Sequence, residues 1–166
     1  TGQQNVFIGD NAAAGAAVTG ATNTIVGDNA GYTLTSGANN SYFGATSGDA
    51  TTTGSQNVAV GSAALTANTT ASNNAAVGFL ALAANTTAPS NVAVGTSSLT
   101  ANTTGDNNTA AGEFSGASVT TGVENTFLGS YSGNTSPQTT TGRYNVILGR
   151  LAHGSGATID SEVVIG

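Results

Sequence analysis

The feature that most constrains this chain is a short motif, Asn-x-x-x-Gly, that recurs along its whole length. Most intervals between copies are identical, one is a single residue longer and one is three longer, and Glu162 replaces the asparagine in the last copy. A regular period of this kind predicts a repeat protein in which each unit is one turn of a stack, so we expect a single domain over residues 1–166. The units begin at Asn5, Asn23, Asn40, Asn57, Asn74, Asn91, Asn108, Asn125, Asn145 and Glu162.

The residue types within a unit favour strands over helices. A period of about 17 residues is too short for helical hairpin repeats, and glycine and β-branched residues disfavour helix. Each unit has a short apolar segment such as residues 57–60, then a glycine such as Gly61 that can adopt positive φ at a turn, then a Thr-rich return. The sequence therefore predicts an all-β fold, a parallel β-solenoid (β-roll) of ten coils of about 17 residues.

Two neighbouring columns of the repeat are apolar in every unit. Adjacent strand residues point to opposite faces, so we expect one column to line the core and the other to need a covering layer. We place Val77 in the core of a middle coil. A thin coil has little chain to spare, and a partner chain is the natural source of the covering layer. The column before the turn glycine is Ile8, Val26, Phe43, Val60, Val77, Val94, Ala111, Leu128, Leu148 and Ile165. Its neighbour is Phe7, Ile25, Tyr42, Ala59, Ala76, Ala93, Ala110, Phe127, Ile147 and Val164.

Side-chain size in the second column varies inversely with size six residues later. The pairs with a large first member are Phe7–Ala13, Ile25–Gly31, Tyr42–Gly48 and Phe127–Gly133. The pairs with a small first member are Ala59–Leu65, Ala76–Leu82 and Ala93–Leu99. Because interiors are close-packed, we predict that the two columns touch. Ala110 and Gly116 break the rule, and we expect Phe114 to fill that gap.

Two polar columns predict ladders along the stack. We expect the ladder asparagines, Asn5 to Asn145, to bond to their own kind in adjacent coils. We expect the same of a Thr/Ser column four residues before each of them, and we expect a surface bulge at Pro137 in the longest unit. The hydroxyl column is Thr1, Thr19, Ser36, Thr53, Thr70, Thr87, Thr104, Thr121, Thr141 and Thr158.

Residues 57–70 (NVAVGSAALTANTT) and 23–31 (NTIVGDNAG) resemble the Gly/Asn-rich repeats of bacteriophage and large-virus tail fibres. Repeats of that type often precede an endosialidase-type chaperone. The units are also similar to the Ser-Val-Ala-Ile-Gly head repeats of trimeric autotransporter adhesins. That resemblance implies left-handed coils, a homotrimer and an extracellular location on a virion fibre or cell surface. The autotransporter repeat is shorter than the present one.

Composition excludes several classes of partner and chemistry. The net charge is −6 and the only basic residues are Arg143 and Arg150, so nothing can neutralise a row of nucleic-acid phosphates. No apolar segment approaches the ~20 residues that span a bilayer. The chain has no cysteine, which rules out disulfides and thiol chemistry. It also lacks methionine, even at position 1, so we expect an internal fragment or a processed product.

Candidate catalytic groups are few. His153 is the only histidine, and Ser155, His153 and Asp160 lack the Gly-x-Ser-x-Gly setting of a hydrolase. Asp160 and Glu162 are two positions apart, but no aromatic platform for a sugar flanks them. Asp10 and Asp28 occupy the same column of adjacent coils and are the weak candidates for a bridging cation. We expect no enzymatic activity, no cofactor and no dedicated metal site.

Three Asn-Thr-Thr triplets match the acceptor for N-linked glycans. They begin at Asn68, Asn85 and Asn102, in the same place of three successive units, so composition and repetition readily produce them. The abundant Thr and Ser offer O-linked sites as an alternative.

Three functions are consistent with these patterns. The first is a non-catalytic shaft or adhesion segment of an extracellular fibre, self-associating and offering a surface to a host glycan or receptor. The second is a repeating segment of another extracellular filament, in which copies stack end to end. The third is an ice-binding Thr ladder, which adjacent threonines such as Thr69 and Thr70 disfavour because they face opposite ways.

Overall fold

A computed structural model describes residues 2–134 and 140–166 of this chain. Its regular structure consists of ten strands of three residues each, one in every repeat unit. The predicted bulge at Pro137 and the hydroxyl of Thr1 lie outside the described residues. The strands are β1 (Val6–Ile8), β2 (Thr24–Val26), β3 (Ser41–Phe43), β4 (Val58–Val60), β5 (Ala75–Val77), β6 (Val92–Val94), β7 (Thr109–Ala111), β8 (Thr126–Leu128), β9 (Val146–Leu148) and β10 (Val163–Ile165).

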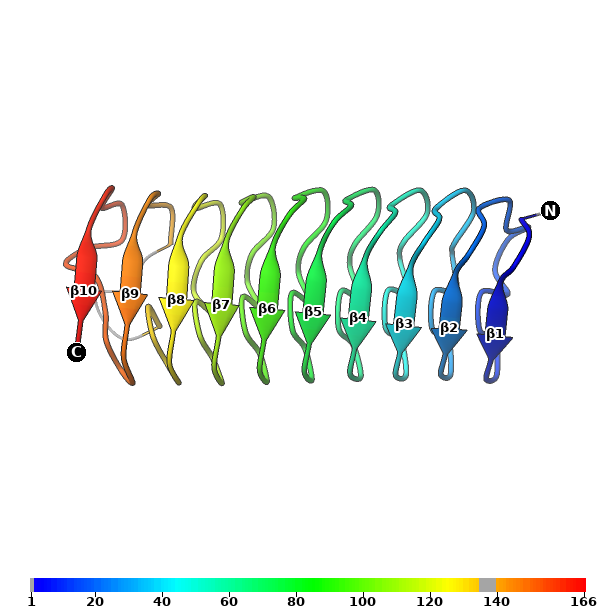
Figure 1. The fold of residues 1–166 in the computed structure, drawn as a ribbon, viewed down its shortest axis with the longest axis horizontal. Coiled ribbons are helices and arrows are strands. Elements are labelled where there is room, and N and C mark those ends of the chain that lie inside the picture. Colours follow the sequence, from blue (N-terminus) through cyan, green and yellow to red (C-terminus); the bar gives the residue numbers. More distant parts are fainter. Residues whose placement is uncertain (1, 135–139) are drawn as a thin grey trace.

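The strands form one parallel sheet in chain order, from β1 to β10 (Figure 1). Equivalent repeat positions pair throughout: Ala59 is opposite both Tyr42 and Ala76 in the register of β3, β4 and β5. The register also holds across the two longer units, so their extra residues lie outside the strands. The predicted all-β, parallel β-solenoid is confirmed. The two ends of the chain lie at opposite ends of the stack (Figure 1).

Hydrogen bonds between coils continue around the rest of each turn. The backbone N–H of Leu65 donates to Ala81 O at 3.0 Å, and that of Thr69 donates to Thr86 O at 2.9 Å. Both bonds join a residue to the next coil, as the strand bonds do. Since these bonds connect coil to coil all the way round, a middle coil satisfies its backbone through its two neighbours.

The corners of the coil use backbone conformations that few residue types favour. Gly61 has φ of +132°, as predicted for the turn glycine. Three other positions in each of the first eight coils are left-handed although most of them are not glycine; in the fourth coil they are Ala63 (φ 56°), Leu65 (φ 53°) and Asn73 (φ 63°). A left-handed residue with a Cβ costs roughly 1–2 kcal/mol. These positions could not be recognised in the sequence, because neighbouring-coil hydrogen bonds rather than residue preference impose them.

A second glycine column, three residues before seven of the nine ladder asparagines, is explained by crowding; Ala71 and Ala88 stand in the other two coils. A Cβ on Gly37 would lie 2.3 Å from the carbonyl oxygen of Gly54 in the next coil, and a Cβ on Gly54 would lie 2.3 Å from Ala71 O. No real Cβ approaches a carbonyl so closely. Glycine therefore lets adjacent coils approach along this edge.

The core is the narrow space between the strand and the return segment. The middle residue of β2 to β9 is fully buried, and where it is large, as in β2, β3 and β8, it packs against the glycine six positions later. A Cβ on Gly48 would lie 2.4 Å from Tyr42 Cε2, and one on Gly133 would lie 2.4 Å from Phe127 Cδ1. The predicted contact between the two size-compensating columns is confirmed.

The prediction for Phe114 was wrong. Its ring is half-buried at the surface and stacks on Tyr131, with centroids 5.0 Å apart. The space at Gly116 is taken by side chains of the adjacent coils, since a Cβ there would meet Phe127 Cδ2 at 2.8 Å and Leu99 Cδ2 at 3.0 Å. Size compensation thus extends between coils as well as within one.

The hydroxyl ladder lies one residue earlier than predicted. Thr69 Oγ1 donates to Thr86 O at 3.0 Å, and the same bond recurs from coil to coil. The column predicted to form the ladder, which includes Thr70 and Thr87, is exposed instead. The prediction failed because both columns are Thr-rich and composition does not tell which one turns inward. The donating threonines are Thr35, Thr52, Thr69, Thr86, Thr103, Thr120 and Thr140.

Candidate interaction surface

The first and third residues of every strand form one outward face of the sheet, which we call the outward face. On most coils it is apolar, and many of its large side chains are about two-fifths exposed: Val60 is 39% and Val94 is 44% exposed. Its exposed large members are Val6, Ile8, Phe43, Val58, Val60, Val77, Val92, Val94, Leu128, Val163 and Ile165. Single apolar residues scattered over a surface are ordinary, but a stripe of this length is not. Such stripes mark interaction sites.

The outward face corrects one prediction from the sequence. Of the two apolar columns, only the one that includes Ala76 is in the core, whereas Val77 is 38% exposed. Val77 is therefore not a core residue of its coil. The first strand residues, Val58 and Val92, share this face and were not predicted to do so; alternation along the strand was the signal that could have found them.

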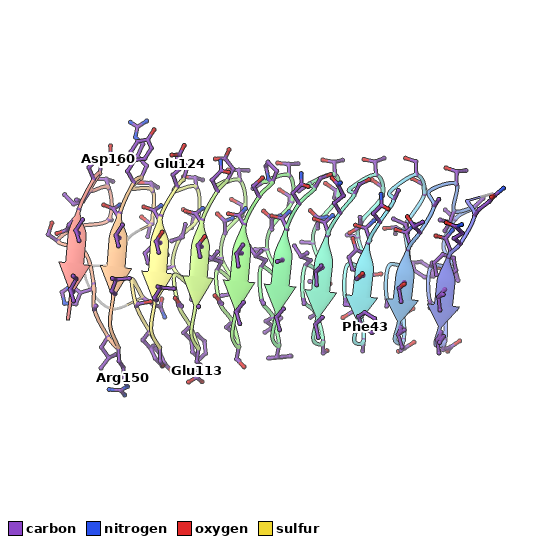
Figure 2. The ribbon with its side chains drawn as sticks, viewed as in Figure 1. Phe43, Glu113, Glu124, Arg150 and Asp160 are labelled. Atoms are coloured by element: carbon purple, nitrogen blue, oxygen red, sulfur yellow. The ribbon has the colours of Figure 1, made fainter. Side chains whose placement is uncertain are left out.

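Charged residues do not interrupt the face. The first and third strand residues are Val, Ile, Leu, Phe, Ala, Thr or Ser in all ten strands. Figure 2 shows Phe43 on the sheet, whereas Glu113 and Arg150 lie at one narrow edge and Glu124 and Asp160 at the other. The face can therefore be covered without burying a charge, which would cost several kcal/mol per ion.

The ladder asparagines hold the strands in register behind this face. Asn57 N–H donates to Asn40 Oδ1 at 3.0 Å, and Asn57 Nδ2 donates to Ala71 O of its own coil at 2.9 Å. The ladder asparagines from Asn23 to Asn145 are buried, and the side-chain oxygen of each has a hydrogen-bond partner. This confirms the predicted asparagine ladder. Each ladder side chain bonds both to the adjacent coil and to the return segment of its own coil. These two bonds fix the start of the strand and hold the outward face in place.

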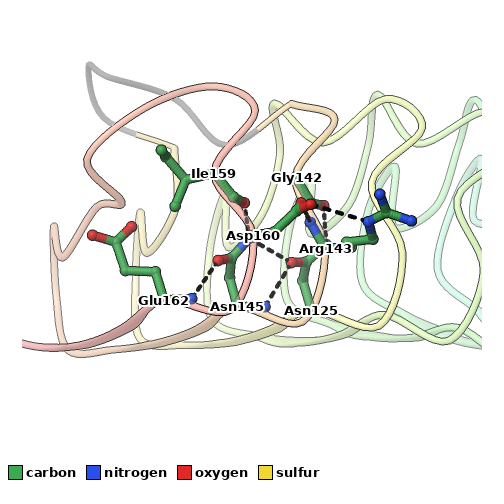
Figure 3. A network of polar contacts seen from close by, with 7 residues as sticks. All are labelled: Asn125, Gly142, Arg143, Asn145, Ile159, Asp160 and Glu162. Carbon is green, nitrogen blue, oxygen red and sulfur yellow. Dashed lines mark hydrogen bonds and ion pairs between the residues drawn. The ribbon is translucent and has the colours of Figure 1, made fainter.

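The ladder ends at Glu162, as Figure 3 shows. Glu162 N–H donates to Asn145 Oδ1 at 2.9 Å, so the backbone keeps the ladder geometry. The carboxylate instead accepts the N–H of Ser155, in the preceding unit, at 2.9 Å.

A second, interior column of polar groups contains the three predicted glycan acceptors. Asn68, Asn85 and Asn102 are fully buried, and their amides donate to backbone carbonyls three residues on. A glycan on any of them would have to leave through the packed core. Burial therefore argues against the glycan prediction, and the hydrogen bonds give the column a structural role.

This interior column is only partly satisfied. Tyr42 Oη donates to Thr51 Oγ1 at 3.2 Å, Asn68 Nδ2 donates to the same hydroxyl at 3.3 Å, and Asn85 Nδ2 reaches Asn68 Oδ1 at 3.5 Å. Asn85 Oδ1 is buried without a partner among the described residues. Burial also raises the pKa of the Tyr42 phenol to about 12. The column therefore has a weak point at Asn85.

The predicted acidic candidates, Asp10 and Asp28, are exposed. Asp28 and Asp10 follow the turn glycines of adjacent coils, and Asp28 Oδ1 accepts the amide of Asn29 at 3.1 Å. No group of three or more His, Cys, Asp or Glu side chains suited to a metal ion occurs in residues 2–134 and 140–166. The pair at Asp10 and Asp28 stays a prediction that nothing in the geometry strengthens.

The groups considered for catalysis are engaged elsewhere. Asp160 Oδ2 accepts Arg143 Nε at 3.1 Å on the exposed edge, and this hydrogen bond and ion pair hold the pKa of Asp160 below its usual range (Figure 3). His153 is exposed and its Nδ1 lies 3.1 Å from Gly154 O. Asp160 is thus committed to Arg143 rather than to His153 or Glu162.

Neither a pocket nor a membrane-spanning helix is present in the part of the chain that the structure describes. Comparison with protein-family models, with curated proteins and with solved structures gave no match to this chain. The outward face is the most distinctive feature of the surface, and it is therefore the feature that bears on function.

Proposed function

We propose that this chain is a non-catalytic structural segment of an extracellular fibre, a shaft or adhesion segment of a viral tail fibre or surface adhesin. The observation that carries the proposal is the uncharged outward face, which has exposed large apolar side chains on seven of the ten strands. A second layer is needed to remove it from water. We propose that other copies of the chain supply that layer, in a homotrimer of left-handed coils, as the resemblance to trimeric adhesin heads implies.

The mechanical properties of the stack support a shaft. Backbone hydrogen bonds, the asparagine ladder and the threonine ladder all run from coil to coil along the axis. Pulling on the ends loads many of these bonds, and proteases find few loose segments. A fibre needs such a spacer between its anchor and its distal tip.

The energetics of the outward face support self-association. Fully burying a Val or Leu side chain contributes roughly 1.5–3 kcal/mol, so covering the exposed part of each contributes on the order of 1 kcal/mol. One chain has eleven such side chains. The free energy gained by burying them against the same face of another copy is enough to offset the cost of association. Because the face carries no charge, identical copies do not repel across it.

Sedimentation of the purified chain tests the proposal. A trimer should have three times the 15.9 kDa mass of one chain. The double variant Val77→Asp/Val94→Asp places charges on the face and should sediment at 15.9 kDa with an unchanged circular dichroism spectrum. A wild-type chain that stays at 15.9 kDa at micromolar concentration would contradict the proposal.

A segment of another end-stacking filament is the second candidate. Phe7, whose column is buried in every coil from β2 to β9, is 38% exposed at the first strand, and Val164, in the same column, is only partly buried at the last. A further coil, from the same chain or from another copy, would cover these side chains. Electron microscopy of the parent assembly distinguishes the two: rods of fixed length favour the shaft, and rods of variable length favour the polymer.

A further inference from the structure

The two narrow edges of the solenoid differ in composition along the chain. We call the two residues after each turn glycine the turn edge, and the two residues before each ladder asparagine the return edge. Figure 2 shows them on opposite sides of the sheet, with Glu113 and Arg150 on the turn edge and Glu124 and Asp160 on the return edge. Each strand therefore has a turn-edge pair at one end and a return-edge pair at the other.

The turn edge becomes apolar beside β7, β8 and β9. Phe114, Tyr131 and Leu151 occupy its second position there, whereas Asn29 and Thr46 stand in that position near the other end. All five have φ between 51° and 62°, a conformation that bulky side chains disfavour. The fold accepts small polar residues at this position, so it does not itself require the large ones.

The return edge becomes apolar beside two of the same strands. Val123 precedes β8 and Tyr144 precedes β9, and Tyr144 is 50% exposed. Val123 stands in the first position of its pair, where the apolar residues of earlier units are the smaller Ala21, Ala38 and Pro89, and the second position beside β8 is the exposed Glu124. Beside the earlier strands the second position, next to the asparagine, is polar and exposed. Those side chains are Thr22, Asn39, Gln56, Asn73, Ser90 and Asn107.

We infer that in the assembly the turn edge of one copy packs on the return edge of the next copy, with the coils parallel and level, and that this contact is concentrated at β8 and β9. The inference rests on the proposed homotrimer. Rotation about a three-fold axis along the stack brings opposite edges of neighbouring copies together at the same height. Tyr131 then lies beside Val123 and Glu124, and Leu151 lies beside Tyr144, so apolar side chains of both edges meet.

The charges are compatible with this arrangement. The Arg150 guanidinium makes no ion pair within residues 2–134 and 140–166, and the return edge places Glu124 one strand before it and Asp160 one strand after it. Level packing also brings Glu113 toward Asp106, but both are on solvated edges where repulsion is screened. Arg143, at the height of Arg150, already has its charge paired with Asp160.

An antiparallel pair of copies would match these edges poorly. A two-fold axis along the strands brings turn edge to turn edge and sets β8 opposite β3 and β9 opposite β2. Tyr131 would then face Thr46, and Leu151 would face Asn29. These two apolar side chains would each meet a polar one, whereas Phe114 would meet Ala63 beside β4. The apolar pair at residues 79–80 beside β5 does not distinguish the two arrangements, because it faces the polar residues 72–73 in the parallel one and the polar residues 96–97 in the antiparallel one.

Cysteine cross-linking of the full chain tests the inference, because the chain has no cysteine of its own. The double variant Tyr131→Cys/Glu124→Cys carries one thiol on each edge at the height of β8. Treatment with a short bis-maleimide should link three copies into a covalent trimer on a denaturing gel. The matched variant Tyr131→Cys/Thr46→Cys, with both thiols on the turn edge, should give no link between copies.

The alternative outcomes are distinguishable by sedimentation of the same samples. Covalent dimers from Tyr131→Cys/Thr46→Cys would overturn the parallel arrangement. A complex of three times 15.9 kDa that yields no cross-link in either variant would overturn the edge contact and leave the proposed trimer intact. A mass of 15.9 kDa for the unmodified chain would overturn both.

Discussion

The two sides of each strand are both apolar, yet they meet different surroundings. Ala59, Ala76 and Ala93 point inward and are completely buried, whereas Val60 and Val77, on the other side, are about two-fifths exposed. The smaller side chains are inside, because a leucine from the return segment fills the same space. Hydrophobicity therefore does not separate core from interface here. What separates them is whether the chain itself supplies a partner.

Variation along the columns shows the same difference. Inside, a large residue such as Tyr42 is matched by a small one such as Gly48, or by a neighbouring coil. Outside, Phe43 and Ala111 occur in one column with no compensating change in the chain. Close packing constrains the inner side within the monomer. On our account the outer side is constrained by the assembly.

The largest effect should come from charging the inner side. Leu82→Asp buries a carboxylate in the apolar core, which we expect to destabilise the fold by more than about 4 kcal/mol. Urea unfolding followed by circular dichroism measures this. The matched change Val77→Asp, on the outer side, should leave the circular dichroism spectrum intact and remove association. Equal loss of structure in both variants would contradict the division into core and interface.

Exchanging sizes inside the core sharpens the comparison. Ala76→Phe alone overpacks the coil by about 1–3 kcal/mol, and Leu82→Gly alone leaves a cavity that costs about 2–5 kcal/mol. The double variant recreates the Phe127–Gly133 pair and should recover most of both losses. Additive losses in thermal unfolding would show that the two columns do not share space.

The ladder asparagines should matter more than the interior ones. Asn40→Ala leaves Asn57 N–H and Gly54 O without their bonds, at about 1–3 kcal/mol for each buried group. Asn85→Val should change the free energy of unfolding by less than about 1 kcal/mol, because its oxygen has no partner among the described residues and Val119 stands at the equivalent place. Chemical denaturation of both variants checks the ranking. An equal cost would mean that the interior column is as well bonded as the ladder.

The smallest effect should come from the left-handed corner. Ala63→Gly relieves a φ of 56° and should stabilise the fold by up to about 1 kcal/mol. The adjacent Ala64→Gly removes a buried methyl group and should cost about 1–2 kcal/mol. The difference between the two melting temperatures is the measurement. A loss in both variants would show that the corner is not strained.

The stack was predictable from the sequence because its constraints are periodic. The coil boundaries, the parallel order, the asparagine ladder and the exchange between Tyr42 and Gly48 all follow from columns that recur once in every coil. A residue type that recurs in every coil shows that the position is constrained, but it does not show whether the side chain points into the core or outward. That is why the threonine ladder was placed one residue late and why Val77 was taken for the core.

Other features could not be read from the sequence at all. The left-handed φ of Leu65 arises from hydrogen bonds to adjacent coils and not from any preference of leucine. The burial of Asn68, Asn85 and Asn102 depends on the return segment turning each of them inward beside a leucine, so a match to a glycan acceptor was a poor guide. The sequence predicted that one apolar side of the sheet needs a covering layer. We propose that other copies of the chain form that layer.

Thiol accessibility on the outward face tests the central claim most directly. Val77→Cys introduces the only thiol of the chain at the middle of the face, and Thr87→Cys places one on an exposed turn as a reference. If copies of the chain cover the face, the thiol at position 77 should react with a maleimide many times more slowly than the thiol at position 87, and dilution to the monomer should abolish the difference. Equal rates at a concentration where the chain is fully folded would contradict the account.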